Sequence, residues 1–281
     1  MPNIAYVNGK WSALSSAKVS VEDRGFQFAD GVYELIRTYH GAVFHLQEHL
    51  KRLYQSLSHI EMDLKMSPDQ LAKIVQTGVK KCGYPEVKIY IQVTRGVAPR
   101  LHHFPKGVQP TLVMTFRRLT PVPKVLSTNG VAVISVLDTR WNCCNVKSLN
   151  LLSNIIAREQ AVRVGAYEAI FVRDRFVLEG AGSNIFAVFG KKAVTPPEGP
   201  TILSGITRDI VLSLGKPLGL KMSEGKLTLP LLKKADELFL TGTTVDILPV
   251  VQLDRQRIGS GSPGKITLLL QEAFKKAAKE H

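Results

Sequence analysis

Apolar and polar residues along the first 120 residues follow two periods, which predict different elements. Alternation with a period of two predicts β-hairpins at 3–14 and 31–46, with Asn8-Gly9 and His40-Gly41 at their tips. Two further alternating stretches predict strands at 86–96 and 110–119. This half of the chain therefore has strands enough for a sheet of its own.

A period near 3.6 predicts two helices between these strands. In the first, apolar side chains recur at helical spacing at Leu46, Leu50, Leu53, Tyr54 and Leu57. The second begins with Ser67 as N-cap and Pro68 at the first helical position, and it ends at Gly83. The first half thus mixes strands and helices without a regular alternation.

The second half shows the same mixture. Strands are predicted at 130–138, three times within 167–190, and on both sides of a loop in 236–254. Helices are predicted from Lys147 to about Gly165, after the segment "SGITRD" at 204–209, around 229–235, and after Pro263. The fold class predicted for the chain is α+β.

A short proline-punctuated segment, "TPVPK" at 120–124, separates the halves. We therefore expect an N-terminal α+β domain at 1–120, a linker at 121–124 and a C-terminal domain at 125–281. A length of 281 residues suits two medium domains.

Composition and charge narrow the class of protein. The longest apolar run, "VAVISVL" at 131–137, is too short for a membrane span, and no basic-then-apolar leader begins the chain. Three cysteines, two of them adjacent, make a poor disulfide framework and fit a reducing cytoplasm. No Cys/His spacing resembles a zinc site. The net charge of +14 is scattered and lacks nucleic-acid motifs, so we expect a small anionic substrate and no nucleic acid.

Lys147 is the first candidate for chemistry. No acid stands within 142–145 to pair with it, and Leu149, Leu151, Leu152, Ile155 and Ile156 predict burial close by. Burial near apolar surface lowers the pKa of a lysine, and a neutral amine can form a Schiff base. An ordinary solvated lysine before a helix is the alternative.

A Schiff-base lysine is typical of enzymes that use pyridoxal phosphate, and the sequence contains groups that this cofactor needs. Glu179, at the end of a strand beside small residues, could keep the pyridine nitrogen protonated. Gly205, Ile206 and Thr207 stand where a helix begins and offer free N–H groups to a phosphate, and "TGTT" at 241–244 adds hydroxyls. Each feature also has an ordinary explanation: a turn at Glu179-Gly180, or an N-cap at Thr207.

Together and in this order, these features resemble the fold-type IV pyridoxal phosphate enzymes, the class IV aminotransferases, and among them most closely the D-amino acid transaminases. The resemblance covers nearly the whole chain. The segments that carry it are "EDRGFQFADGVYE", "HLKRL", "VTRGVAPRLHHFP", "VKSLNLLSNIIA", "YEAIFV", "LEGAGSNIF", "LSGITRD" and "ELFLTGTT". It implies a two-domain fold with a smaller N-terminal α/β domain and a larger, β-barrel-like C-terminal domain.

The resemblance also implies roles for single residues. Lys147 is similar to the Schiff-base lysine that moves a proton at the substrate Cα, and Glu179 to the partner of the pyridine nitrogen. The implied phosphate and ring contacts are Arg52, which lies off the apolar stripe of its helix, with Leu203, Ile206, Thr207 and Thr243. The implied substrate contacts are Tyr33, Arg100, His102 and Thr244.

Substrate choice depends on Arg100 and His102, which face the same way if their segment is extended. The D-amino acid transaminases hold the substrate carboxylate with such a pair, and a basic loop in a basic protein is the alternative. We expect a ping-pong transfer of the amino group of D-amino acids, such as D-alanine and D-glutamate, to 2-oxo acids. A branched-chain or (R)-amine transaminase, or an aminodeoxychorismate lyase, stays open on the same scaffold.

Two features complete the expectations. Ala181-Gly182 and Gly242 stand where relatives often have serine, which puts cofactor affinity and substrate range in doubt. The resemblance further implies a homodimer, which composition alone does not indicate. Cys143 and Cys144 are expected to be packing residues beside the site.

Overall fold

The computed structural model describes residues 3–280 and divides them into two compact units. The first runs to Thr120 and also includes Val146–Asn150; the second comprises Pro121–Asn145 and Leu151–Glu280. The division differs from the domain boundaries expected from the sequence, because residues 146–150 group with the first unit and 121–124 with the second. Each unit is described by itself.

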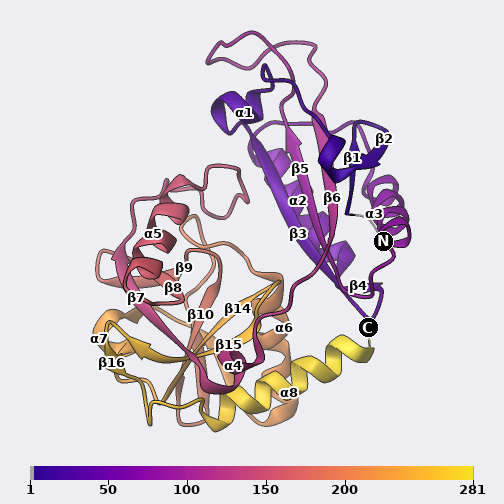
Figure 1. The fold of residues 1–281 in the computed structure, drawn as a ribbon. Coiled ribbons are helices and arrows are strands. Elements are labelled where there is room, and N and C mark those ends of the chain that lie inside the picture. The colour runs from indigo at the N-terminus through magenta and orange to yellow at the C-terminus, as the bar shows by residue number, and fades with distance from the viewer. Residues whose placement is uncertain (1–2, 281) are drawn as a thin grey trace. The chain divides into compact units, whose positions relative to one another are not determined.

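The first unit is built on a six-stranded antiparallel sheet (Figure 1). Its order is β2-β1-β6-β5-β3-β4. The strands are β1 (Ile4–Val7), β2 (Lys10–Ala13), β3 (Gly31–Tyr39), β4 (Ala42–Val43), β5 (Val87–Thr94) and β6 (Thr111–Arg118). Buried and half-buried residues alternate along most of β5, as expected when one face of a sheet is covered.

Two long helices, α2 (Leu46–His59) and α3 (Pro68–Cys82), pack on each other and on this sheet, α2 against β3 and α3 against β6 and β1. Gly78 allows α3 its close approach, since a Cβ there would lie 2.1 Å from the Phe116 ring. The unit also contains the one-turn helix α1 (Arg24–Phe28) and the 3₁₀ turn η1 (Leu14–Ser16).

Local sequence signals were accurate in this unit. Asn8-Gly9 and His40-Gly41 have positive φ angles and connect the two predicted hairpins. The Ser67 hydroxyl accepts from the Gln70 N–H in a capping box, and Gly83 follows α3 in the left-handed conformation. These three predictions are confirmed.

The second unit is built on a ten-stranded mixed sheet. Along the path β12-β11-β10-β14-β15-β7-β8-β9-β13, the pairs β15–β7, β7–β8 and β11–β12 are parallel. Its strands are β7 (Val131–Leu137), β8 (Glu168–Arg173), β9 (Phe176–Gly180), β10 (Asn184–Phe189), β11 (Lys192–Thr195), β12 (Lys221–Glu224), β13 (Leu227–Thr228), β14 (Glu237–Gly242), β15 (Asp246–Leu253) and β16 (Gln256–Arg257), which pairs with β15.

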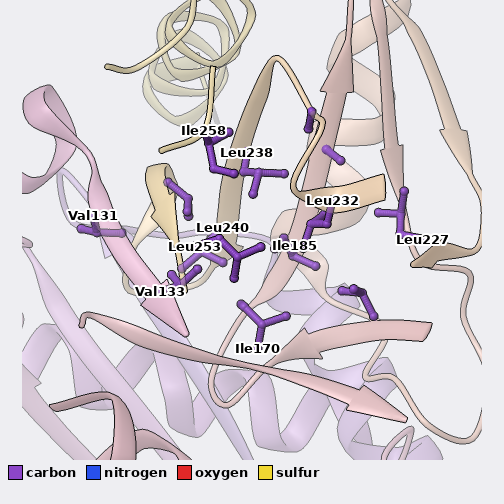
Figure 2. Close-up of a cluster of buried hydrophobic side chains, with 14 of the residues drawn as sticks. Val131, Val133, Ile170, Ile185, Leu227, Leu232, Leu238, Leu240, Leu253 and Ile258 are labelled. Carbon is purple, nitrogen blue, oxygen red and sulfur yellow. The ribbon is translucent and has the colours of Figure 1, made fainter. Parts of the chain in front are cut away.

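This sheet is curled, as the expectation of a barrel-like domain requires. Strands β9 and β10 are far apart along the sheet, yet only residues 181–183 connect them, and the Gly180 N–H donates to the Ser183 carbonyl at 2.7 Å. The strands between them must therefore bend round until β9 returns to β10. Figure 2 shows the result, a cluster in which Val133, Ile170, Ile185 and Leu240 point inward from four different strands.

The helices of the second unit are α4 (Lys124–Asn129), α5 (Leu152–Arg163), α6 (Ile206–Gly215), α7 (Leu229–Leu232), α8 (Lys265–Glu280) and the 3₁₀ turn η2 (Lys216–Leu218). The predicted start of a helix directly after Lys147 was wrong, because α5 begins only at Leu152. The predicted burial was wrong as well, since Leu152, Ile155 and Ile156 are 66%, 60% and 50% exposed. Helix α5 packs through Ala157 and Ala161 instead.

No helix between residues 3 and 280 is both long enough and apolar enough to cross a membrane. Two sheets of different topology, each with its own helices, confirm the α+β class.

Candidate active site

Lys147 is held by strand pairing. Its carbonyl accepts from the Tyr33 N–H at 2.9 Å, and the Leu149 N–H donates to the Gly31 carbonyl at 3.0 Å. Ser148 forms a β-bridge with Val32. Residues 147–149 therefore behave as a short extra strand beside the start of β3, which is why they group with the first unit.

A glycine at position 31 makes this pairing possible. A Cβ at Gly31 would lie 2.9 Å from Cδ1 of Leu149 and 2.5 Å from the Val93 carbonyl oxygen, and both are closer than real Cβ contacts. The Lys147 N–H donates to the Ser56 hydroxyl at 3.2 Å, which ties the segment to α2 as well. The backbone of Lys147 is thus fixed from two sides.

The Lys147 amine lies over an aromatic ring, with Nζ 4.5 Å from the centroid of Tyr33. Within residues 3–280 it forms no ion pair with a carboxylate. The two predicted residues Lys147 and Tyr33 are therefore brought together. An amine on a ring face, without a carboxylate partner, is available for covalent chemistry.

Arg52 is buried against Glu34. Arg52 Nε donates to Glu34 Oε1 at 2.6 Å and Nη2 donates to Oε2 at 2.9 Å, while His49 Nδ1 lies 2.8 Å from Oε2. Its side chain is only 8% exposed although Arg52 stands off the apolar stripe of α2, because it is buried against a carboxylate and not against apolar residues. The bidentate pair fixes the plane of the guanidinium, which is how arginine is set to bind a second anion such as phosphate.

The charges in this cluster determine its protonation. Burial would raise the pKa of Glu34, but Arg52 and His49 outweigh it and lower the pKa well below the usual glutamate value. An ionised Glu34 only accepts, so His49 Nδ1 is the donor. Burial lowers the pKa of His49, against the opposing effect of Glu34, and the Arg52 and Lys147 charges lower it further. A neutral His49 therefore presents Nε2 as an acceptor.

Glu179 lies in the second unit, and its carboxylate accepts three bonds. Arg140 Nη1 donates to Oε1 at 2.5 Å, whereas Asn184 Nδ2 and the Leu203 N–H donate to Oε2 at 3.2 and 3.1 Å. The side chain is only 5% exposed. A buried carboxylate that accepts from a guanidinium and two further donors has the charge partner and the fixed orientation that a group bonded to a cationic ring nitrogen needs.

Sequence reasoning missed Arg140. Its guanidinium also donates to both oxygens of Asp138 and to the Thr201 carbonyl, and it lies 4.1 Å from the Phe171 ring centroid. Burial opposes its charge, but the Asp138 and Glu179 carboxylates prevail and raise its pKa. No local pattern marks Arg140, because Glu179 is 39 positions away along the chain.

Helix α6 begins as its sequence predicted. Gly205 is the N-cap, no side chain caps the helix, and Ile206 and Thr207 are its first two residues. The alternative that Thr207 is merely an N-cap is wrong. Gly205 must be glycine, because a Cβ would lie 2.0 Å from Asn184 Oδ1. The N–H groups of the first turn have no intrahelical acceptors and are suited to an anion.

Thr243 and Thr244 lie in the turn between β14 and β15 and are partly exposed. Gly242 lies close to Gly182, the other position where relatives often have serine. A Cβ at Gly242 would lie 3.6 Å from the Gly182 carbonyl oxygen. Thr241, the first residue of the predicted hydroxyl segment, is the partner of Asn184 in the pairing of β14 with β10. Its hydroxyl is buried and has no hydrogen-bond partner in the part of the chain described. The end of β14 thus contains a polar atom that a ligand could satisfy.

Arg100 and His102 lie together on the exposed loop between β5 and β6. Arg100 Cζ is 4.6 Å and the His102 ring 5.7 Å from the centroid of Phe28, so the two share one aromatic neighbour. Within residues 3–280 no hydrogen bond, ion pair or ring contact joins this pair to Tyr33 or Lys147.

Cys144 is buried, and its thiol donates to the Trp141 carbonyl at 3.2 Å. Burial raises the pKa of this thiol to about 11, so it is protonated at neutral pH and is a poor nucleophile. Cys143 is half-buried. Between residues 3 and 280, no three His, Cys, Asp or Glu side chains form a group that could hold a metal ion.

The family model described as amino-transferase class IV matches residues 31–253, which contain every one of these candidate residues. The chain belongs to the class IV aminotransferases. Two relatives in this family are proteins named D-alanine aminotransferase. The one from Staphylococcus haemolyticus is 40% identical, with 96% of each chain covered. The one from Bacillus licheniformis is 41% identical, covering 95% of this chain and 94% of the relative.

Solved class IV aminotransferases share the fold. The Escherichia coli branched-chain amino acid aminotransferase has a TM-score of 0.92 at 26% identity, with 98% of this chain and 94% of the other covered. The branched-chain amino acid aminotransferase from Thermobaculum terrenum, solved in its PLP-form, has a TM-score of 0.88 at 26% identity, with 99% and 94% covered. The likeness spans both units of this class IV aminotransferase.

Proposed function

We propose that the chain is a pyridoxal phosphate-dependent aminotransferase that moves the amino group of D-amino acids, such as D-alanine and D-glutamate, to 2-oxo acids. The observation that carries this proposal is the full-length identity of 40–41% to proteins named D-alanine aminotransferase. The two solved branched-chain enzymes are 26% identical over a similar share of the chain. The fold is common to both groups, so the difference in identity is what separates them.

The residues present suit the cofactor. The second unit has a buried anion at Glu179, uncapped first-turn N–H groups at Ile206 and Thr207, and an unpartnered hydroxyl at Thr241. When bound, pyridoxal phosphate supplies an electron-accepting ring that stabilises negative charge at the substrate Cα. In this proposal Glu179 binds the ring nitrogen and α6 binds the phosphate. Leu203, whose N–H is held by Glu179, supports the ring, and Thr243 adds a donor to the phosphate.

Lys147 is the proposed base of the reaction. With pyridoxal phosphate bound, the Lys147 amine would hold it covalently and would serve as the base for the proton at the substrate Cα. Arg52, oriented by Glu34, binds the phosphate. Tyr33, Arg100, His102 and Thr244 are the proposed substrate contacts. The two half-reactions follow a ping-pong order.

The carboxylate role of Arg100 is what makes an amino acid, and not a simple amine, the proposed donor. A guanidinium binds a carboxylate in a bidentate manner. The imidazole of His102 and the guanidinium of Arg100 both contact the Phe28 ring. An (R)-amine has no group that uses this pair. D-specificity itself rests on the relatives and not on the geometry.

A panel of D- and L-amino acids, with (R)-1-phenylethylamine, tests the proposal against 2-oxoglutarate and pyruvate. We expect turnover with D-alanine and D-glutamate and little with L-leucine or the amine. Preferred turnover of L-leucine would replace the proposal with a branched-chain aminotransferase, and preferred turnover of the amine with an (R)-amine transaminase. Release of pyruvate from 4-amino-4-deoxychorismate, without transfer to any 2-oxo acid, would indicate the lyase.

We also propose a cytoplasmic homodimer. The outward face of α5 exposes Leu152, Ile155 and Ile156, which follow one another at i, i+3 and i+4. Contiguous exposed apolar side chains on one helix face mark an interaction surface. A second copy of the chain would bury this face, and three free cysteines are compatible with a reducing compartment.

A further inference from the structure

The loop that carries Arg100 and His102 connects β5 to β6 and contains no helix or strand of its own. Both side chains are exposed, and neither forms an ion pair within the described residues. Loops without such contacts sample many conformations, and a substrate would have to order them at a cost in affinity. The question is therefore what holds this pair in place.

Arg24 contacts the loop between the two residues. Its Nη1 donates to the Leu101 carbonyl at 2.5 Å, and Leu101 is the single residue that separates Arg100 from His102. Its Nε donates to Asp30 Oδ2 at 2.8 Å, and the side chain is only 4% exposed. Arg24 therefore links the carboxylate of Asp30, which is 12% exposed, to the backbone of the candidate substrate loop.

Phe28 contacts the same pair from the side. Arg24 and Phe28 are the first and last residues of α1, so their i, i+4 spacing puts them on one face. The ring centroid of Phe28 lies 4.8 Å from Arg24 Cζ and 4.6 Å from Arg100 Cζ, and the His102 ring lies 5.7 Å away. The ring is a common platform for the buried arginine and the two exposed side chains.

Asp30 also binds a second arginine, Arg95, at the start of the loop. Arg95 Nε lies 3.0 and 2.8 Å from the two Asp30 oxygens, and its terminal nitrogens donate to the Ile60 and Glu61 carbonyls. Arg95 Cζ also lies 3.6 Å from the Phe104 ring centroid. Arg95 thus fixes the start of the loop and contacts Phe104 within it. Arg24 bonds to Leu101, directly between Arg100 and His102.

We propose that Arg24 is a positioning residue that sets the substrate-carboxylate affinity by fixing the Arg100–His102 segment, with Phe28 as its platform. This inference rests on the proposed function, because it assigns a support to that function's carboxylate pair. Arg24 acts through Leu101 and Phe28 and does not itself touch the substrate. Lysine would not replace it, because a single ammonium cannot serve Asp30 and Leu101 in the fixed directions of a planar guanidinium.

The test is a double-mutant cycle between Arg24→Met and Arg100→Ala, with KM and kcat measured for D-alanine. We expect Arg24→Met to raise KM about tenfold or more with little change in kcat, since misplacement of a binding group by about 1 Å has effects of this order. In the Arg100→Ala background the same change should have almost no further effect on KM. Arg24→Lys should resemble Arg24→Met, and Phe28→Leu should raise KM in the same direction.

The control is Lys106→Met, which removes an exposed cation from the same loop and should leave KM unchanged. Propionate is a carboxylate without an amine, and its inhibition constant should rise in each variant whose KM rises. Should Arg24→Met fail to fold, Phe28→Leu in the same cycle with Arg100→Ala decides the matter. An unchanged KM in a folded Arg24 variant, or effects that add fully to those of Arg100→Ala, would overturn the inference.

The failure of the proposed function has a different signature. Wild-type protein that transfers no amino group from any D-amino acid would refute that function before any variant is compared. The wild type could instead turn over D-alanine normally while the Arg100→Ala variant keeps the same KM. That result would refute the carboxylate pair, and with it the role of Arg24.

Discussion

Arg140 Nη1 lies 2.5 Å from Oε1 of Glu179, and the two side chains are only 6% and 5% exposed. Glu179 is the residue proposed to bind the cofactor ring nitrogen, so its charge and direction matter for the chemistry. Arg140 secures both, because it is itself fixed by Asp138 and by the Phe171 ring. The Glu179 carboxylate is thus one member of a buried network that also includes Arg140 and Asp138.

Replacing Arg140 with methionine tests this network. Removing one partner of a buried ion pair leaves an uncompensated charge and typically costs about 3 kcal/mol or more. We expect the free energy of unfolding of the apoenzyme to fall by that order, and the affinity for pyridoxal phosphate to fall as well. Urea denaturation and a fluorescence titration with the cofactor measure the two effects.

Arg163→Met is the matched control, since Arg163 pairs with Glu159 on the exposed surface of α5. Exposed i, i+4 pairs contribute about 0.5 kcal/mol or less, so this variant should unfold and bind the cofactor like the wild type. Equal losses in both variants would show that the Arg140–Glu179 pair has no special role.

Lys147→Ala should abolish turnover and still bind pyridoxal phosphate through the phosphate contacts. The reason is that only the lysine supplies a covalent bond and a base, whereas other residues bind the phosphate. Borohydride reduction followed by peptide mass spectrometry should find the cofactor attached to Lys147 in the wild type and unattached in the variant. Wild-type turnover by Lys147→Ala would refute its role.

Glu34→Gln should destabilise the protein in a pH-dependent way. The pKa of Glu34 is lowered on folding, so the ionised carboxylate contributes stability at every pH above its unfolded value near 4.5, and the contribution is lost as the pH falls further. We expect a loss of about 3 kcal/mol at pH 7, because Arg52 and His49 lose a buried partner. The difference from the wild type should shrink below pH 4.5.

Urea denaturation at a series of pH values between 7 and 4 measures this difference. Glu159→Gln, at an exposed position of α5, should show no comparable change. A difference between wild type and Glu34→Gln that is just as large at pH 4 as at pH 7 would contradict the lowered pKa.

Gly242→Ser should be tolerated and should tighten cofactor binding. A Cβ at this position would lie 3.4 Å from Val245 Cγ2 and 3.6 Å from the Gly182 carbonyl oxygen, which are ordinary contacts, and the φ angle is not positive. The added hydroxyl would lie in the loop assigned to the phosphate. Titration of the apoenzyme should show a lower dissociation constant by a few-fold, about 1 kcal/mol for one hydrogen bond. Weaker binding would remove this loop from the phosphate site.

Leu152→Lys combined with Ile155→Lys should convert a dimer into monomers. The changes place two charges on the exposed apolar face of α5, where a second copy could bury them only at high cost. Sedimentation velocity should find the wild type at twice the mass of the variant. Val21→Lys, at an equally exposed apolar residue of the first unit, should leave the mass unchanged. A monomeric wild type would refute the proposed dimer.

Much of the fold could be predicted because it depends on neighbours in the chain. Asn-Gly and His-Gly turns adopt positive φ angles at both predicted hairpins, and a capping box at Ser67 satisfies orphan N–H groups within one turn. Candidate residues such as Lys147, Glu179 and Thr207 could be named for a related reason. Their side-chain types and order resemble a family whose chemistry demands them.

The predictions that failed concern contacts between distant segments. The helix expected directly after Lys147 does not form there, because pairing with Tyr33 and Gly31 of β3 competes with local helix propensity and prevails. Leu152 and Ile155 were predicted to be buried but are exposed. Hydrophobicity indicates that a side chain favours burial, but it does not indicate which surface covers the side chain.

The sequence by itself therefore determined the α+β class and most element positions, and it named the groups that are proposed to react. Only the tertiary structure decided how those groups are held: Glu179 by Arg140, Arg52 by Glu34, and the Arg100–His102 loop by Arg24. The physical reason is that a buried charge needs a partner of opposite sign. For Arg52 and Glu179 that partner is supplied by folding, from residues 18 and 39 positions away along the chain.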